Sequence, residues 1–332
     1  MSRLGRGLVL TTLLAAAAYA LIAAAWGDLS RVGGYLVRFP LLPLAGAALL
    51  ASLNYAFRFW RWQLYLTELS VAVPVLPSLA IFLAGFSLTL TPGKVGEVLK
   101  SYLLRARHGV PLARTAPIVV AERLTDLLAL LLLGLCGAGS LMGRGELWLT
   151  GVGFALCALV LGTVASRRLA HGAIRLLGHL LPGGLRQRLL PRVQAFYDAA
   201  ALLLRPRPLG WAVLLAVAAW MCECVAFLVI LRTFAGVHSS LLTATFIYAM
   251  TTVAGALAFV PGGLGVTEGG MALLIVRLCP GADESVAVAA TLLVRLVTLW
   301  FAVGLGLVAL LLLRRIGGVA VNLDELGPLQ SA

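Results

Sequence analysis

The sequence is poor in charge, and poorest in acidic residues. Only 12% of its 332 residues are charged, and only 13 are Asp or Glu. A folded soluble domain carries about a quarter charged residues, so no segment here qualifies as one. Hydrophobic residues make up 61%, and the mean hydropathy is +1.02. The sequence therefore predicts an all-α integral membrane protein, whose structural unit is a span of about 20 residues.

Histidine and cysteine are also scarce. The four His residues fall at the ends of apolar runs or in connections, which argues against a metal or His-based catalytic centre inside the membrane. Of the five Cys, Cys222 and Cys224 are one residue apart, with no further ligand at zinc spacing. A Gly-x4-Gly-Lys-Ser/Thr phosphate loop is absent as well. We therefore expect no metal, no cofactor, no ATP hydrolysis and no enzyme activity.

Apolar runs of spanning length are what the chain has in abundance. Six of them predict full transmembrane helices, near residues 8–25, 41–66, 115–142, 148–166, 209–234 and 285–313. The first exceeds the apolar part of a signal peptide and is interpreted as an uncleaved span. Two more regions, 78–107 and 240–278, are apolar but interrupted by a Pro-Gly pair.

The limbs of the first interrupted region are about 14 residues each, or roughly 21 Å of helix, against a bilayer core of ~30 Å. This predicts a re-entrant helical hairpin. Region 240–278 has a longer first limb, so both a re-entrant hairpin and a full span remain open there. Broken backbone at membrane depth needs protein or a watery cavity to satisfy its polar groups.

The two interruptions form a repeat with an offset of 169 residues. This offset relates Pro92 to Pro261, Gly93 to Gly262, Gly96 to Gly265, Asn54 to Glu223, and Asp126 to Arg295. Each half has the order span, broken hairpin, span, and one extra span joins the halves. The second half therefore enters the membrane from the opposite side, as in the inverted-topology repeats of secondary transporters.

This organisation predicts five segments. An N-terminal helix and connection (1–40) precede the first repeat (41–142). A connecting span and basic amphipathic surface helices (143–208) lead to the second, inverted repeat (209–315) and a cytoplasmic tail (316–332).

The hairpin tips are the predicted binding site. A half-helix begins after each tip, and its unsatisfied N–H groups and dipole favour an anion, with Lys94 beside the first tip. Carbonyls ending the entering limbs could hold a cation. Glycine suits these positions because it permits tight turns and close backbone approach.

Charges at membrane depth are costly and usually functional. This chain has eight: Lys94, Glu97, Glu122, Arg123, Asp126, Glu223, Glu268 and Arg295. Glu122 and Asp126 lie one helical turn apart, a placement that favours a cation between them or a shared proton. Two interpretations remain open, a transport site and an ion-pair network that fixes the hairpins to their flanking spans.

The net charge of +13 is interpreted as membrane topology rather than nucleic-acid binding. Of 26 Lys and Arg residues, 18 fall on the side of the N-terminus, five on the other side, and three at membrane depth. This places both termini in the cytoplasm. Arg58 and Arg61, with Trp62, are expected where a span meets the cytoplasm, as interfacial anchors or as contacts to lipid phosphate.

Four motifs carry a family resemblance. They are Asn54-x3-Arg58-x2-Arg61-Trp62, Pro92-Gly93-Lys94-x-Gly96-Glu97-x2-Lys100, Glu122-Arg123-x2-Asp126 and Pro261-Gly262-Gly263-x-Gly265-x2-Glu268. In this order they resemble the lysylphosphatidylglycerol synthase transmembrane-region, or flippase-like, family. The resemblance implies a bacterial inner-membrane protein. It also implies a link to aminoacylated, polyprenyl-phosphate or hopanoid lipids. The soluble aminoacyl transferase domain of bifunctional members is absent, so lysyl transfer is not implied.

Three functions follow as hypotheses. The first is a flippase that moves an anionic or phosphate-bearing lipid by alternating access, using the motif residues together with Glu223 and Arg295. Its candidate partners are that lipid, a coupling proton or cation, a lipid-synthesis enzyme and a second copy of the chain. The second is a non-catalytic scaffold of a lipid-synthesis pathway. The third, an intramembrane lipid-modifying enzyme, lacks a recognisable nucleophile–base pair.

Overall fold

In the computed structural model, residues 28–89, 95–138, 151, 155, 183–258 and 260–317 are described, and they contain helices and no strand. The predicted first span (8–25) lies outside these residues, as do almost all of span 148–166 and surface segment 167–182. The helices of the first part are α2 (Leu29–Arg38), α3 (Leu41–Glu68), α4 (Val75–Ala84), η1 (Gly85–Leu88), α5 (Val95–His108) and α6 (Leu112–Ala138).

The second part begins with α9 (Gly183–Leu203) and continues with a similar series. Its helices are α10 (Pro206–Thr233), α11 (Leu241–Leu257), η3 (Pro261–Gly263), α12 (Val266–Leu278), α13 (Glu284–Arg295), the π-helical turn η4 (Leu296–Trp300) and α14 (Phe301–Gly317). The order from α10 to α14 thus parallels that from α3 to α6.

Three described helices are long and apolar enough to cross a membrane: Leu41–Glu68, Pro206–Thr233 and Glu284–Leu313. They match three of the six expected spans. Helix α6 has 27 residues and also runs from one end of the bundle to the other, but it carries Glu122, Arg123 and Asp126. The expected total of six full spans extends beyond the described residues.

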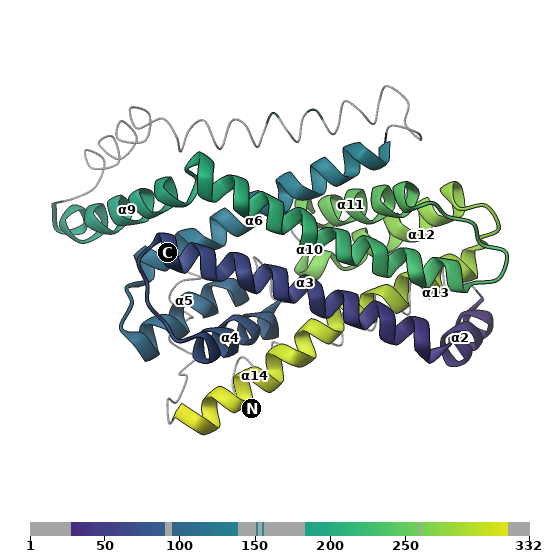
Figure 1. Cartoon of the computed structure of the whole chain (residues 1–332), viewed down its shortest axis with the longest axis horizontal. Helices are drawn as coiled ribbons and strands as arrows, with labels where there is room; N and C mark the ends of the chain where they lie inside the picture. Colours follow the sequence, from purple (N-terminus) through teal and green to yellow (C-terminus); the bar gives the residue numbers. More distant parts are fainter. Residues whose placement is uncertain are drawn as a thin grey trace.

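Helices α3 and α10 cross the middle of the molecule side by side (Figure 1). Phe39 before α3 packs on Phe234 after α10, with 5.6 Å between ring centroids. Halfway along, the Asn54 side chain donates a 2.8 Å hydrogen bond to the Ala219 carbonyl. The start of α3 thus meets the end of α10, and the middles of the two helices meet as well, so the two helices are antiparallel.

The bundle has two ends. At the α2 end, His238 N–H donates to the Pro280 carbonyl over 3.0 Å, which joins the entrance of α11 to the exit of α12. At the α9 end, the Arg114 side chain donates to the Leu69 carbonyl, which joins the exit of α5 to the entrance of α4. Each hairpin therefore begins and finishes at one end, and the two use opposite ends.

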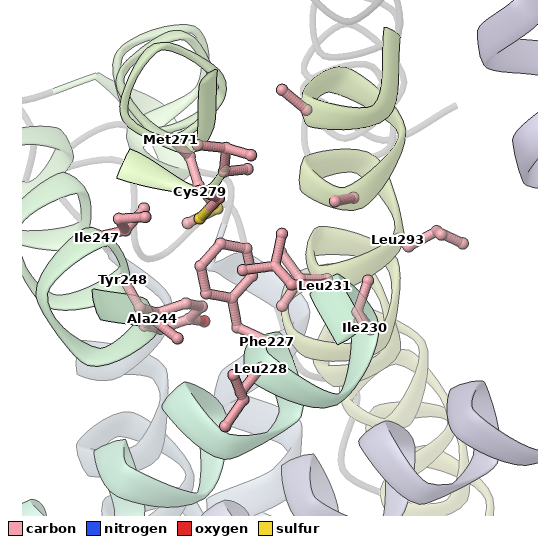
Figure 2. Close-up of a cluster of buried hydrophobic side chains, with 14 of the residues drawn as sticks. Phe227, Leu228, Ile230, Leu231, Ala244, Ile247, Tyr248, Met271, Cys279 and Leu293 are labelled. Atoms are coloured by element: carbon pink, nitrogen blue, oxygen red, sulfur yellow. The ribbon is translucent and has the colours of Figure 1, made fainter. Parts of the chain in front are cut away.

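Each half contributes its last helix to the core of the other. Leu130 and Leu133 of α6 belong to the core of the second half, where Ile247 and Met271 gather around Phe227 (Figure 2). Reciprocally, α14 packs on α4 and η1 in the core of the first half.

One glycine in each half permits this exchange. A Cβ at Gly137 of α6 would stand 2.6 Å from the Leu242 carbonyl oxygen of α11, and one at Gly306 of α14 would stand 2.3 Å from the Ser87 nitrogen of η1. These glycines are also 169 residues apart.

Candidate functional site

The second hairpin turns on three glycines in the left-handed region, Gly262, Gly263 and Gly265, with φ of 62°, 71° and 85°. Side chains with a Cβ rarely adopt this backbone, which explains the glycine-rich tip. Helices α11 and α12 pack closely behind the tip, because Gly255 of α11 has no Cβ: one placed there would lie 2.0 Å from Thr267 Oγ1 of α12.

Glu268 fixes this tip from inside. It is the third residue of α12, and its Oε2 accepts the Gly265 N–H over 2.7 Å while its Oε1 accepts Arg295 Nε over 2.6 Å. Arg295 also donates from Nη2 to the Gly262 carbonyl, at 2.6 Å. The Glu268 carboxylate therefore occupies the N-terminus of α12, where the sequence predicted a bound anion. Arg295 holds the tip against α13.

The first tip is described only in part. Pro92, Gly93 and Lys94 lie outside the described residues, so their predicted roles stay predictions. Gly96 and Glu97 are the second and third residues of α5, and only their backbone is described.

Lys100, one turn further along α5, is buried. Its Nζ lies 2.6 Å from Glu122 Oε2 on α6 and 4.7 Å from the centre of the Trp62 ring on α3. The ring of Phe82 lies on another side, at 5.5 Å. A carboxylate and two aromatic faces thus replace water around this ammonium group.

Asp126 is the most heavily contacted acid of α6. Arg61 Nη1 lies 2.7 Å from its Oδ1, and Trp220 Nε1 donates to the same oxygen over 3.2 Å. Arg123 lies 3.3 Å from Oδ2 and Arg58 lies 4.0 Å from it. The expectation of one cation or proton shared by Glu122 and Asp126 was wrong, because each acid pairs with its own basic residue.

Arg61 and Trp62 were expected as interfacial anchors or as contacts to lipid phosphate, and their burial contradicts both roles. Both are buried, and Trp62 Nε1 donates to Ser78 Oγ over 3.0 Å. Lys100 is also buried, and Arg58 is largely turned into the protein. The physical reason is the pair of carboxylates on α6, which neutralise these cations within the bundle.

Arg58 is the basic side chain of this group with the loosest contacts. It is 18% exposed, its closest carboxylate is the 4.0 Å contact to Asp126, and its guanidinium lies 5.5 Å from the Phe86 ring centre. It therefore stands beside η1, where the first hairpin approaches its tip.

Glu223 and Asn54, the pair related by the 169-residue offset, both lie at the α3–α10 crossing. Asn54 is bonded to Ala219, one turn before Glu223, and Glu223 Oε2 accepts from Tyr248 Oη over 2.6 Å. Nearby, Tyr55 Oη donates to the Thr298 carbonyl in the π-helical turn, also at 2.6 Å.

Sequence reasoning missed Tyr55, Tyr248 and Trp220. Tyr55 follows Asn54 directly, and Trp220 precedes Glu223 by three residues. Both could have been recognised from their closeness in sequence to a candidate site residue. Tyr248 lies in a plain apolar run, and nothing in the sequence distinguishes it. Within the described residues, no group of three or more His, Cys, Asp or Glu side chains is placed to hold a metal.

Both hairpins also contact one segment of the last helix. Leu264 of the second tip packs with Leu299 and Val303, while Gly306 lies against Ser87 and Phe86 of the first hairpin. The close ion pairs join α3 to α6, α5 to α6, and α12 to α13.

The fold and this site define a multi-pass helical membrane protein with ion pairs buried in its core. Residues 8–306 match the family described as the lysylphosphatidylglycerol synthase TM region, and the chain belongs to that family. A search of curated proteins found no match. The family's name relates it to lipid chemistry at membranes, in agreement with the resemblance of the four motifs.

Proposed function

We propose that the chain is a transporter that moves an anionic or phosphate-bearing lipid across the bacterial inner membrane by alternating access, without catalytic activity of its own. The observation that carries this proposal is the set of buried charged side chains on α3, α5, α6, α10 and α12. Ionised side chains are costly at membrane depth, and where they occur in numbers they usually mark a transport path.

The proposed mechanism rests on an inverted repeat, and four observations support that repeat. The helix order recurs, α3 and α10 are antiparallel, the hairpins start from opposite ends, and each half packs its last helix on the hairpin of the other. In repeats of this kind one half rocks against the other around a central site, which opens first to one side and then to the other.

The hairpins fit re-entrant elements. Helices α11 and α12 have 17 and 13 residues, or about 26 and 20 Å of helix, against a bilayer core of ~30 Å. Each hairpin returns to the end from which it entered, so their tips would lie within the membrane and be satisfied by the helices around them.

Arg58 is the proposed contact for the lipid phosphate, together with Lys94 and the N-terminus of α5. Arg61 and Lys100 are each held at 2.6–2.7 Å by a carboxylate. Arg58 is more exposed than either of them, and its nearest carboxylate oxygen is 4.0 Å away. A phosphate could therefore approach it without breaking a close ion pair.

A scaffold function is the alternative, and one observation favours it. Lys100, Arg61 and Arg295 each have a close carboxylate partner on another helix, an arrangement that also serves to hold helices together. A scaffold would need these pairs for folding but would move no lipid.

Lipid translocation in proteoliposomes tests the site. Arg58→Ala is expected to slow the movement of fluorescent phosphatidylglycerol by about tenfold or more, since a hydrogen bond to a charged group contributes about 1.5–3 kcal/mol. Arg58→Lys should retain part of the rate. Arg38→Ala, which removes an exposed arginine at the end of α2, is the control. A wild-type rate in Arg58→Ala would exclude Arg58 from the lipid path.

A further inference from the structure

Glu223 differs from the other buried acids in its partner. Glu122, Asp126 and Glu268 each lie 2.6–2.7 Å from a Lys or Arg nitrogen. Among the described residues, no basic nitrogen comes within 4.0 Å of the Glu223 carboxylate. Its hydrogen bond comes from the neutral hydroxyl of Tyr248, at 2.6 Å.

Besides Tyr248, several charged and titratable groups face this carboxylate from the packed helices and from α10 itself. They are Arg58, Tyr55, Asp126, Arg295, Cys222 and Cys224. Arg58 and Arg295 favour the charged carboxylate, and Asp126 opposes it. Arg295 is already bound to Glu268 and to the Gly262 carbonyl, so it is not available as a close partner.

The position of Glu223 is central. It lies one turn from Ala219, which bonds Asn54 at the midpoint of the α3–α10 crossing. Asn54 is also its counterpart at the 169-residue offset of the sequence. In the transport mechanism proposed above, rocking of the halves would expose a residue at this crossing to each side in turn.

We propose that Glu223 is the proton-binding residue through which lipid movement is coupled to a proton gradient, an inference that rests on the proposed transport function. A carboxylate buried without a cation partner is costly, and binding a proton removes that cost. The proton would come from water on one side and form an O–H bond on the carboxyl group, which still accepts from Tyr248. After the halves rock, that O–H bond breaks, and the proton leaves to water on the other side.

Infrared difference spectroscopy tests proton binding without any need for transport. The purified wild-type protein in phosphatidylglycerol vesicles should show a carboxylic-acid C=O band that titrates with pH. Glu223→Gln should lose this band, and Glu284→Gln, the same change at an exposed position, should keep it. Tyr248→Phe should shift the band to higher frequency, because the hydrogen bond is gone. An unchanged band in Glu223→Gln would overturn the proposal.

Translocation of fluorescent phosphatidylglycerol under an imposed pH gradient tests the coupling. Wild type should move lipid faster with the gradient than without it, whereas Glu223→Gln should give the same rate under both conditions. A gradient response that persists in Glu223→Gln would overturn the coupling role. If wild type moves no lipid while the infrared band still titrates with pH, the transport proposal fails and the proton site stands.

Discussion

At the scale of single residues, a buried ionised side chain is tolerated when an opposite charge replaces the lost water. Lys100 with Glu122, Arg61 with Asp126, and Arg295 with Glu268 follow this rule at 2.6–2.7 Å. Such a pair adds little stability compared with an apolar pair of similar size, but removing one member leaves an unmatched charge. This asymmetry can be measured.

Lys100→Met is expected to destabilise the protein by about 3–5 kcal/mol, because Glu122 then loses its 2.6 Å partner. The double variant Lys100→Met/Glu122→Leu should recover most of this loss, since no charge is left unmatched. Equilibrium unfolding in detergent micelles measures both. If the single and the double variant lose the same free energy of unfolding, the unmatched charge on Glu122 is not the cause of the loss.

Glu268→Ala should loosen the second hairpin tip, because it removes the acceptor of the Gly265 N–H and the partner of Arg295. Loss of a helix N-cap alone costs about 1 kcal/mol. Hydrogen–deuterium exchange of the peptide that covers 260–268 should therefore quicken. Asp283→Ala, which removes the cap of α13 at the exposed α2 end, serves as the control and should leave the tip unchanged.

The sequence predicted which residues carry buried charge but not how they pair. Glu122 and Asp126 could be recognised because acids are rare in an apolar run. Their partners Lys100 and Arg61 come from other helices, 22 and 65 residues away, and which nitrogen faces which oxygen depends on how those helices cross. Arg61 was expected as an interfacial anchor and is instead buried against Asp126. A basic residue near the end of a span has the same local sequence whether it faces lipid or protein.

At the scale of helices, close packing of the halves depends on glycine at equivalent positions. Gly306→Ala should destabilise the protein by about 1–3 kcal/mol, because the new Cβ would press on the backbone of Ser87 and Phe86. Gly304→Ala on the same helix meets nothing within 4 Å and should be tolerated. Thermal unfolding of the two variants compares them directly, and equal midpoints would argue against the close contact.

The break in the second hairpin could be predicted because proline and glycine act locally. Pro261 and Gly262 interrupt an apolar run, and the backbone there takes the positive φ values that glycine permits. The π-helical turn at Leu296–Trp300 carries no such mark in the sequence. It forms where Tyr55 bonds the Thr298 carbonyl, a contact between segments more than 240 residues apart in sequence.

At the scale of the whole molecule, the described basic residues outside the core separate between the two ends. The segments at the α2 end carry Arg31, Arg38, Arg232 and Arg277. The segments at the α9 end carry Arg105, Arg107, Arg114, Arg192, Arg205, Arg207 and Arg315. By the positive-inside rule, this excess predicts that the α9 end faces the cytoplasm.

Cysteine labelling in intact cells tests this orientation. In a background without native cysteines, Arg38→Cys should react with a membrane-impermeant maleimide added outside. Arg207→Cys, also exposed, should react only after the membrane is permeabilised. The reverse pattern would invert the topology, and labelling of both from outside would contradict two separate ends.

The central claim, that this chain moves anionic lipid, is tested most directly by the purified wild-type protein in vesicles that contain one fluorescent lipid at a time. If the chain is such a transporter, phosphatidylglycerol or a polyprenyl phosphate should cross faster than in protein-free vesicles, and phosphatidylcholine should show a smaller effect. If none of these lipids, nor an aminoacylated one, moves faster than in protein-free vesicles, transport is contradicted and the scaffold function takes its place.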